Sequence, residues 1–196
     1  MHFAAEPRDA EGTTVRYIIE HRGSTFTVKA FATGLLSMFG HSPTIAIPGF
    51  KGEASLNPDA LEQSSLRMGI QSSSLTVTDD ISNKDRDEIN HAMHEDVLES
   101  NSFPDIVFEC SRVSASKTGE GLYWVALNGE LTLHGVTRNQ SVLARVSVNG
   151  QSLRATGEFS VRMSDYEIRP VSAVGGTVRL KDELKLSFAI NARQQV

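Results

Sequence analysis

The chain of 196 residues contains one cysteine, Cys110, so it cannot form a disulfide within itself. Cys110 lies in the alternating segment 106–110, on the same side as Ile106 and Phe108. We interpret it as a small core residue, because its sequence context shows no neighbour that would activate a nucleophilic thiol. Apolar residues never continue for the roughly 18 positions that a membrane-spanning helix needs. We therefore expect membrane contact to be peripheral at most.

Positive charge is also scarce, since 19 Lys and Arg stand against 24 Asp and Glu and give a formal net charge of -5. No cluster of basic residues alternates with aromatic ones, so nucleic acid is not expected as a partner. Residues 1–14 form a polar leader without the apolar core of a secretion signal. These features predict a cytoplasmic protein with the leader at 1–14 and a single domain over 15–196.

The dominant pattern in this chain is alternation of apolar and polar residues. It runs through 127–133, passes a glycine turn at 134–135 and resumes over 142–148, which predicts an antiparallel hairpin with one wet face. The same pattern predicts further strands on both sides of this hairpin. The expected strands are 15–21, 26–32, 45–56, 65–78, 106–113, 123–133, 140–148, 153–163 and 177–190.

Turn and bend residues predict how these strands connect. Arg22-Gly23-Ser24 predicts a turn that makes an opening hairpin, and Asn149-Gly150 is the preferred pair for a two-residue hairpin loop. Pro48 and Gly49 predict a strong bend in the strand at 45–56, whose expected partner is the strand at 65–78. Edge pairing through this bent strand would allow a homodimer.

One helix is expected, from a cap at Ser82 to about residue 98. Its apolar stripe is Ile89, Ala92, Met93 and Val97, a spacing typical of a helix that lies on a sheet or closes the end of a barrel. The fold class is therefore all-β with one flanking α-helix. Many antiparallel strands with one apolar face form either a sandwich or a closed barrel, and alternation alone fits both.

Four stretches resemble a known family. Residues 129–138 (Gly-Glu-Leu-Thr-Leu-His-Gly-Val-Thr-Arg), Arg86-Asp87 followed by 103–108, then 162–168, and finally 180–188 are similar, in this order, to the motifs of the YceI-like family of lipid-binding, lipocalin-like proteins. The resemblance covers about residues 15–192. It implies an eight-stranded antiparallel lipocalin-like barrel with one flanking α-helix. It also implies a non-enzymatic protein that requires no cofactor and binds a long isoprenoid-type lipid, such as a polyprenyl chain or a quinone precursor.

Inward-facing apolar residues of the expected strands are the candidate walls of such a lumen, where they would supply shape and desolvation. The short glycine-bounded segment at 34–40 either plugs the end of the core or forms an entrance, for which Leu36, Met38 and Phe39 are the candidates. The wall candidates are Phe26, Val28, Ile106, Phe108, Leu131, Leu133, Phe159, Val161, Leu186 and Phe188.

Two alternatives stay open at this point. His91 and His94, with Asp87 on the same helix and His41 from the glycine-bounded segment, would supply the ligand types of a zinc-like site and hence of a metal-dependent enzyme. The competing interpretation of these residues is an ordinary solvated helix face. In the second alternative, large side chains fill the lumen completely and the barrel serves as a structural or interaction module.

Overall fold

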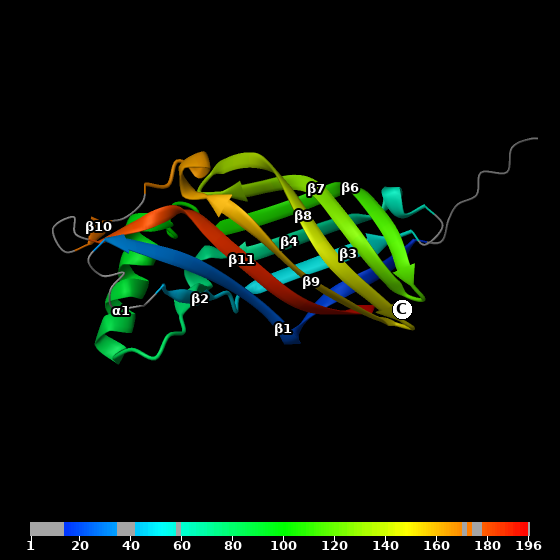
Figure 1. Ribbon diagram of the computed structural model, residues 1–196, viewed down its shortest axis with the longest axis horizontal. Coiled ribbons are helices and arrows are strands. Elements are labelled where there is room, and N and C mark those ends of the chain that lie inside the picture. The colour runs from blue at the N-terminus through cyan, green and yellow to red at the C-terminus, as the bar shows by residue number, and fades with distance from the viewer. Residues whose placement is uncertain (1–13, 35–41, 58–59, 170–171, 174–177, 196) are drawn as a thin grey trace, which may run out of the picture.

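The computed structural model describes residues 14–34, 42–57, 60–169, 172–173 and 178–195 (Figure 1). Its helical elements are α1 (Asn83–Ala92), the π-helical turn η4 (Met93–Val97) and the 3₁₀ turns η2 (Leu61–Gln63), η3 (Ser72–Ser74) and η5 (Met163–Tyr166). Its strands are β1 (Val15–Gly34), β2 (Thr44–Ala46), β3 (Phe50–Leu56), β4 (Ser65–Gln71), β5 (Thr76–Val77), β6 (Asp105–Gly119), β7 (Leu122–Leu133), β8 (Val136–Asn149), β9 (Ser152–Arg162), β10 (Ser172–Ala173) and β11 (Val178–Gln194).

The strands close into a barrel because β1 pairs with β3 on one side and with β11 on the other. All pairings are antiparallel, and the order β11-β9-β8-β7-β6-β4-β3-β1 follows the chain around the barrel. The short strands β2 and β5 pair with each other and extend the β3–β4 hairpin beyond the bend. The result is the expected eight-stranded antiparallel barrel with one helix, and the sandwich is excluded.

The expected opening hairpin is wrong, because 15–34 is one continuous strand. Its register against β11 shifts between Glu20 and Thr25, which makes a bulge where a turn was predicted. Gly23 has φ +79°, and its carbonyl accepts a hydrogen bond from Asn191 Nδ2 at 2.7 Å. The Ser24 hydroxyl also accepts from the Asn191 N–H at 2.9 Å, so the neighbouring strand holds the bulge in place.

The predicted bend of 45–56 is confirmed, and it divides the expected strand into β2 and β3 at residues 47–49. The expected pairing with 65–78 is confirmed, since β3 pairs with β4 and β2 with β5. Gly49 and Ser74 meet at this corner, where the Ser74 hydroxyl accepts from the Gly49 N–H at 3.1 Å. β2 pairs with β1 and β5, and β3 pairs with β4 and, over residues 53–56, with β1, so most of the bent strand is already paired within the chain.

Of two expected hairpin turns, the one at 134–135 forms where it was predicted and the other is shifted by one residue. His134 and Gly135 connect the paired residues Leu133 and Val136 with φ of +51° and +73°, the positive pair of a type I′ turn. The Asn149-Gly150 prediction is off by one residue. Asn149 still pairs with Ser152, so the loop is Gly150-Gln151.

The predicted helix begins as expected, because the Ser82 hydroxyl accepts a hydrogen bond from the Asp85 N–H at 3.1 Å. Asn90 fastens it to β5, accepting from the Val77 N–H at 2.9 Å and donating to the Thr76 hydroxyl at 3.1 Å. The helix therefore sits at one end of the barrel (Figure 1). Among the described helices, none has the length and apolar character needed to cross a membrane.

Asp182 on β11 ties the last strand to the turn η5. Its carboxylate accepts from the Ser164 hydroxyl at 2.6 Å and from the Ser164 N–H at 2.8 Å. These two hydrogen bonds lower the pKa of Asp182 below its ordinary value, with the hydroxyl as the larger cause. The contact joins two of the sequence motifs noted above, 162–168 and 180–188.

We expect Asp182→Asn to lower the free energy of unfolding at pH 7 by roughly 0.5–1 kcal/mol, a value reduced for solvent screening. Because the pKa is lower in the folded state, this stabilisation is present above the unfolded-state pKa of about 3.9 and is lost as pH falls through the folded one. Urea unfolding at pH 7 and pH 3 measures it. The assignment of this stabilisation to Asp182 would be contradicted if wild type and Asp182→Asn differed in stability as much at pH 3 as at pH 7. An equal loss of stability in Asp165→Asn, on the same turn, would also contradict it.

Candidate functional site

The inner face of the barrel is built by the alternation seen in the sequence. In β1, Tyr17 and Ile19 are buried, whereas the intervening Ile18 is exposed and Arg16 pairs on the outside with Glu53. Each of the long strands repeats this arrangement, because successive side chains of a strand point to opposite faces. A barrel closed from such strands therefore has an almost wholly apolar interior.

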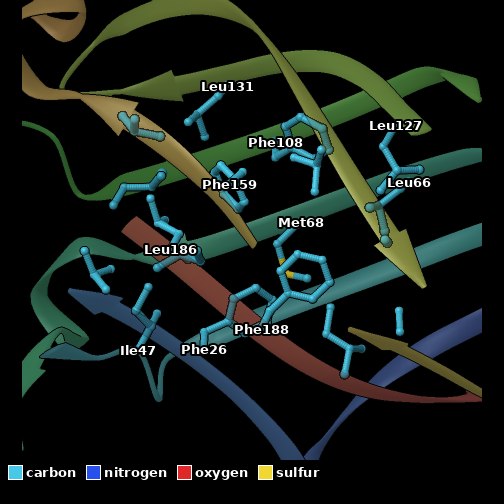
Figure 2. Close-up of a pocket in the computed structure, with 18 of the residues that line it drawn as sticks. Phe26, Ile47, Leu66, Met68, Phe108, Leu127, Leu131, Phe159, Leu186 and Phe188 are labelled. Atoms are coloured by element: carbon cyan, nitrogen blue, oxygen red, sulfur yellow. The ribbon is translucent and has the colours of Figure 1, made fainter. Parts of the chain in front are cut away.

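This interior encloses a cavity of about 740 Å³. Its wall runs from Ile81 and Ile89 at the α1 end to Leu56 and Val148 at the other end, so the cavity extends along the barrel. Figure 2 shows Phe26, Phe108 and Leu131 reaching into it from different sides of the barrel. The lumen is therefore not filled by its own side chains, which removes the ground for the filled-barrel alternative.

All ten wall candidates from the sequence line this cavity. Those with large side chains, such as Phe26, Phe159 and Leu186, are only partly buried although they face inward. These side chains contact their neighbours, as Phe26 does where its ring stacks on Phe188 with centroids 5.8 Å apart, but their partial exposure on an inner face shows that they also border open volume. The structure thus brings the candidates together, and their contact with a ligand stays a prediction.

The helix contributes to the same wall. Ile89, Ala92, Met93 and Val97, the apolar stripe predicted from sequence, all border the cavity. Met93 is buried, and with the neighbouring Leu98 it belongs to the core cluster at this end of the barrel. The stripe therefore faces the barrel interior. The entrance candidates Leu36, Met38 and Phe39 lie outside the described residues.

The electrostatic character of the cavity is set by very few groups. Among the described lining residues there is no Lys, Arg or His, and the one charged side chain is Asp79. Asp79 is a structural carboxylate, because its Oδ2 accepts from the Thr44 N–H at 2.7 Å. Tyr17 and Ser64 are buried polar residues of the wall, and burial raises the pKa of the Tyr17 hydroxyl. Sequence reasoning missed both, although the inward register of Tyr17 was readable from the alternation of β1.

The proposed metal ligands do not come together. Asp87 and His91 are exposed, and His94 is partly buried with its Nδ1 at 3.2 Å from the Ser100 hydroxyl. None of the three lines the cavity, and His41 lies outside the described residues. Over the ranges that the structure describes, no group of three or more His, Cys, Asp or Glu is placed to hold a metal ion.

Cys110 is buried, as expected of a core residue. It packs with Val113 and Val125, and its thiol lies 3.4 Å from the carbonyl oxygen of Arg112. Burial raises the pKa of the thiol, which keeps it protonated and unreactive at neutral pH. The residue has a packing role beside the bulge that separates it from Arg112 in β6.

Comparison with known proteins finds a matching family model and several solved structures with a similar fold. The family model described as a YceI-like domain matches residues 9–192. BcnA of Burkholderia cenocepacia superposes with a TM-score of 0.68 at 18% identity, over 88% of this chain and 98% of that one. A domain from Saccharophagus degradans, described as polyisoprenoid-binding and implicated in plant cell wall breakdown, has a TM-score of 0.64 at 10% identity, over 91% and 98%. The YceI protein of Campylobacter jejuni has a TM-score of 0.58 at 16% identity, over 78% and 85%. No curated protein sequence matched this chain.

Proposed function

This chain belongs to the YceI-like family, and from that membership we propose that it binds a long apolar lipid of isoprenoid type inside its barrel. The observation that carries the proposal is the apolar cavity of about 740 Å³ that runs along the lumen. A protein of this size gains stability by closing such a space with its own side chains. A large apolar cavity retained in the core therefore favours a role in holding a ligand.

The cavity volume sets the scale of the ligand. If each heavy atom with its hydrogens takes about 30 Å³, the share of one water in the liquid, the cavity holds on the order of 25 heavy atoms, or about five isoprene units. At roughly 0.3 kcal/mol per heavy atom, such a ligand gains about 7 kcal/mol. The corresponding dissociation constant is in the low micromolar range.

The relatives support the same proposal. The Saccharophagus degradans domain, which shares this fold, is described as polyisoprenoid-binding. The long apolar wall of the present chain has the physical character that such a ligand requires, since each buried CH₂ contributes about 0.8 kcal/mol. A binding role, not a catalytic one, fits this wall, because it presents no pair of groups for acid–base or nucleophilic chemistry among its described residues.

Native mass spectrometry of gently purified protein, followed by organic extraction and lipid analysis, tests the proposal. The expected result is a releasable apolar lipid at one copy per chain. Delipidated protein should then unfold about 5–10 °C higher with geranylgeraniol at a hundredfold excess over the dissociation constant, because that occupancy adds about 2.7 kcal/mol. The proposal would be refuted if the purified protein carried no lipid and if no long prenyl lipid raised its unfolding temperature.

A further inference from the structure

Tyr17 is the buried polar side chain of the lumen that the apolar wall does not explain. It lies near the start of β1, pairs across the sheet with Ala54 and Gln194, and is 3% exposed. The start of β1 lies at the end of the barrel opposite α1 (Figure 1). Its neighbours on the inner face, including Ile19 and Ala192, are apolar.

The Tyr17 hydroxyl has no hydrogen-bond partner among the described residues. In the described part of the chain, the one fully buried side-chain nitrogen or oxygen without a partner is Nε2 of His134. The unpaired Tyr17 hydroxyl is therefore not fully buried and keeps some accessible surface. The open volume that Tyr17 borders is the cavity. A ligand that displaces water from this hydroxyl without replacing its hydrogen bond loses free energy, so a group that accepts or donates a hydrogen bond is favoured beside Tyr17.

The chemistry of that group follows from the remaining wall. A phosphate or carboxylate in this lumen would be an unpaired buried charge, because the described wall holds no cationic side chain. Ser64 is the other buried wall residue with a hydroxyl, and this hydroxyl already accepts a hydrogen bond from the Asn57 N–H at 3.1 Å. Tyr123 also borders the cavity, but it is only half-buried and has access to water. An uncharged oxygen satisfies the Tyr17 hydroxyl without the cost of a charge.

We infer that Tyr17 binds an uncharged oxygen, a hydroxyl or a carbonyl, at the head of the lipid, and that the lipid lies with its head toward the start of β1 and its tail toward α1. This inference rests on the proposed function and adds to it an orientation and a ligand class. It separates prenyl alcohols and ketones from two other classes. Pure hydrocarbons leave the Tyr17 hydroxyl unpaired, and prenyl phosphates bring a charge that the lumen does not neutralise.

The test compares geranylgeraniol, the corresponding hydrocarbon without the hydroxyl, and geranylgeranyl phosphate on delipidated protein. In Tyr17→Phe, affinity for geranylgeraniol should fall roughly 2- to 10-fold, the worth of one net hydrogen bond, whereas affinity for the hydrocarbon should stay equal or rise. Tyr166→Phe is the matched control, since Tyr166 is equally buried, at 2% exposed, but does not line the cavity. It should leave the ratio of the two affinities unchanged.

Orientation is read independently with a prenyl alcohol that carries a photoreactive diazirine at its tail. Cross-links are expected on α1 and η4, within residues 89–97, and cross-links on residues 15–19 would overturn the orientation. Equal loss of both ligands in Tyr17→Phe, or tightest binding by the phosphate in wild type, would overturn the assignment of Tyr17. Failure of wild type to bind any of the three lipids would instead refute the proposed function.

Discussion

Replacing Ala144 by aspartate is expected to abolish lipid binding and to lower the stability of the barrel. Ala144 lies in β8, is 1% exposed and lines the cavity between its paired neighbours Val125 and Gly157. An aspartate at this position places a carboxylate on the inner face, where the near-complete burial of Ala144 allows only partial hydration by water in the empty lumen. A lipid that displaces this water leaves an unpaired charge in an apolar space, because the described wall offers no cation to pair with it.

The expected loss exceeds about 100-fold, because an unpaired buried charge costs several kcal/mol and each 1.4 kcal/mol is tenfold in affinity. Isothermal titration with geranylgeraniol measures it, and circular dichroism checks the fold. The neutral isostere Ala144→Asn should lose much less. Ala126→Asp is the matched control, because Ala126 pairs with Leu143 on the outer face and does not line the cavity. Equal losses in the inner and outer aspartate variants would argue against binding in the lumen.

Replacing Gly129 by alanine is expected to have the largest effect on stability. Gly129 lies in β7 opposite Cys110, beside the register shift between Cys110 and Arg112 in β6. A Cβ at this position would press into the carbonyl oxygen of Glu109 and would come within 2.9 Å of Cys110 Cα. Both are backbone atoms of a paired strand, so neither can move without disturbing the ladder.

We expect a loss of about 3 kcal/mol or more, which lowers the unfolding temperature by roughly 6–12 °C or prevents folding. The control is Gly69→Ala in β4, the strand that pairs with β6 on the side opposite β7. There the Cβ would find its nearest atom at 3.7 Å, the Cε of Lys51, which is an ordinary contact. This variant should be neutral or stabilised by about 0.4–1 kcal/mol. Thermal unfolding of both variants decides, and similar unfolding temperatures would contradict the close-approach explanation.

The wall of the lumen was predictable from sequence because a strand has a period of two. Once Leu131 and Phe188 are assigned to apolar faces, closure of the sheet places both in one interior. Alternation cannot decide closure itself, since the same faces would pack together in a sandwich. That decision depends on the pairing of β1 with β11, which joins residues far apart in the chain.

The errors arose where a local signal has two structural meanings. Arg22-Gly23-Ser24 has the composition of a turn, but the Asn191 side chain and backbone bind it as a bulge within one strand. His91 and His94 have a spacing found in metal sites, but sequence could not place a third ligand beside them, and the described residues supply none. Tyr17 was overlooked for the opposite reason, because a tyrosine among inward residues looks like ordinary core until its missing partner is known.

The seam between β1 and β11 has a kinetic consequence. Its paired residues, such as Tyr17 and Gln194 or Phe26 and Phe188, are separated by most of the chain. Pairing across such separations is slow, because the entropy of closing a long loop must be lost before the contacts form. The neighbouring strands from β3 to β9 can zip up as successive hairpins first. Until residues 178–194 have been synthesised and have paired, β1 and β9 each present an unpaired edge, and during this interval the chain is open to aggregation.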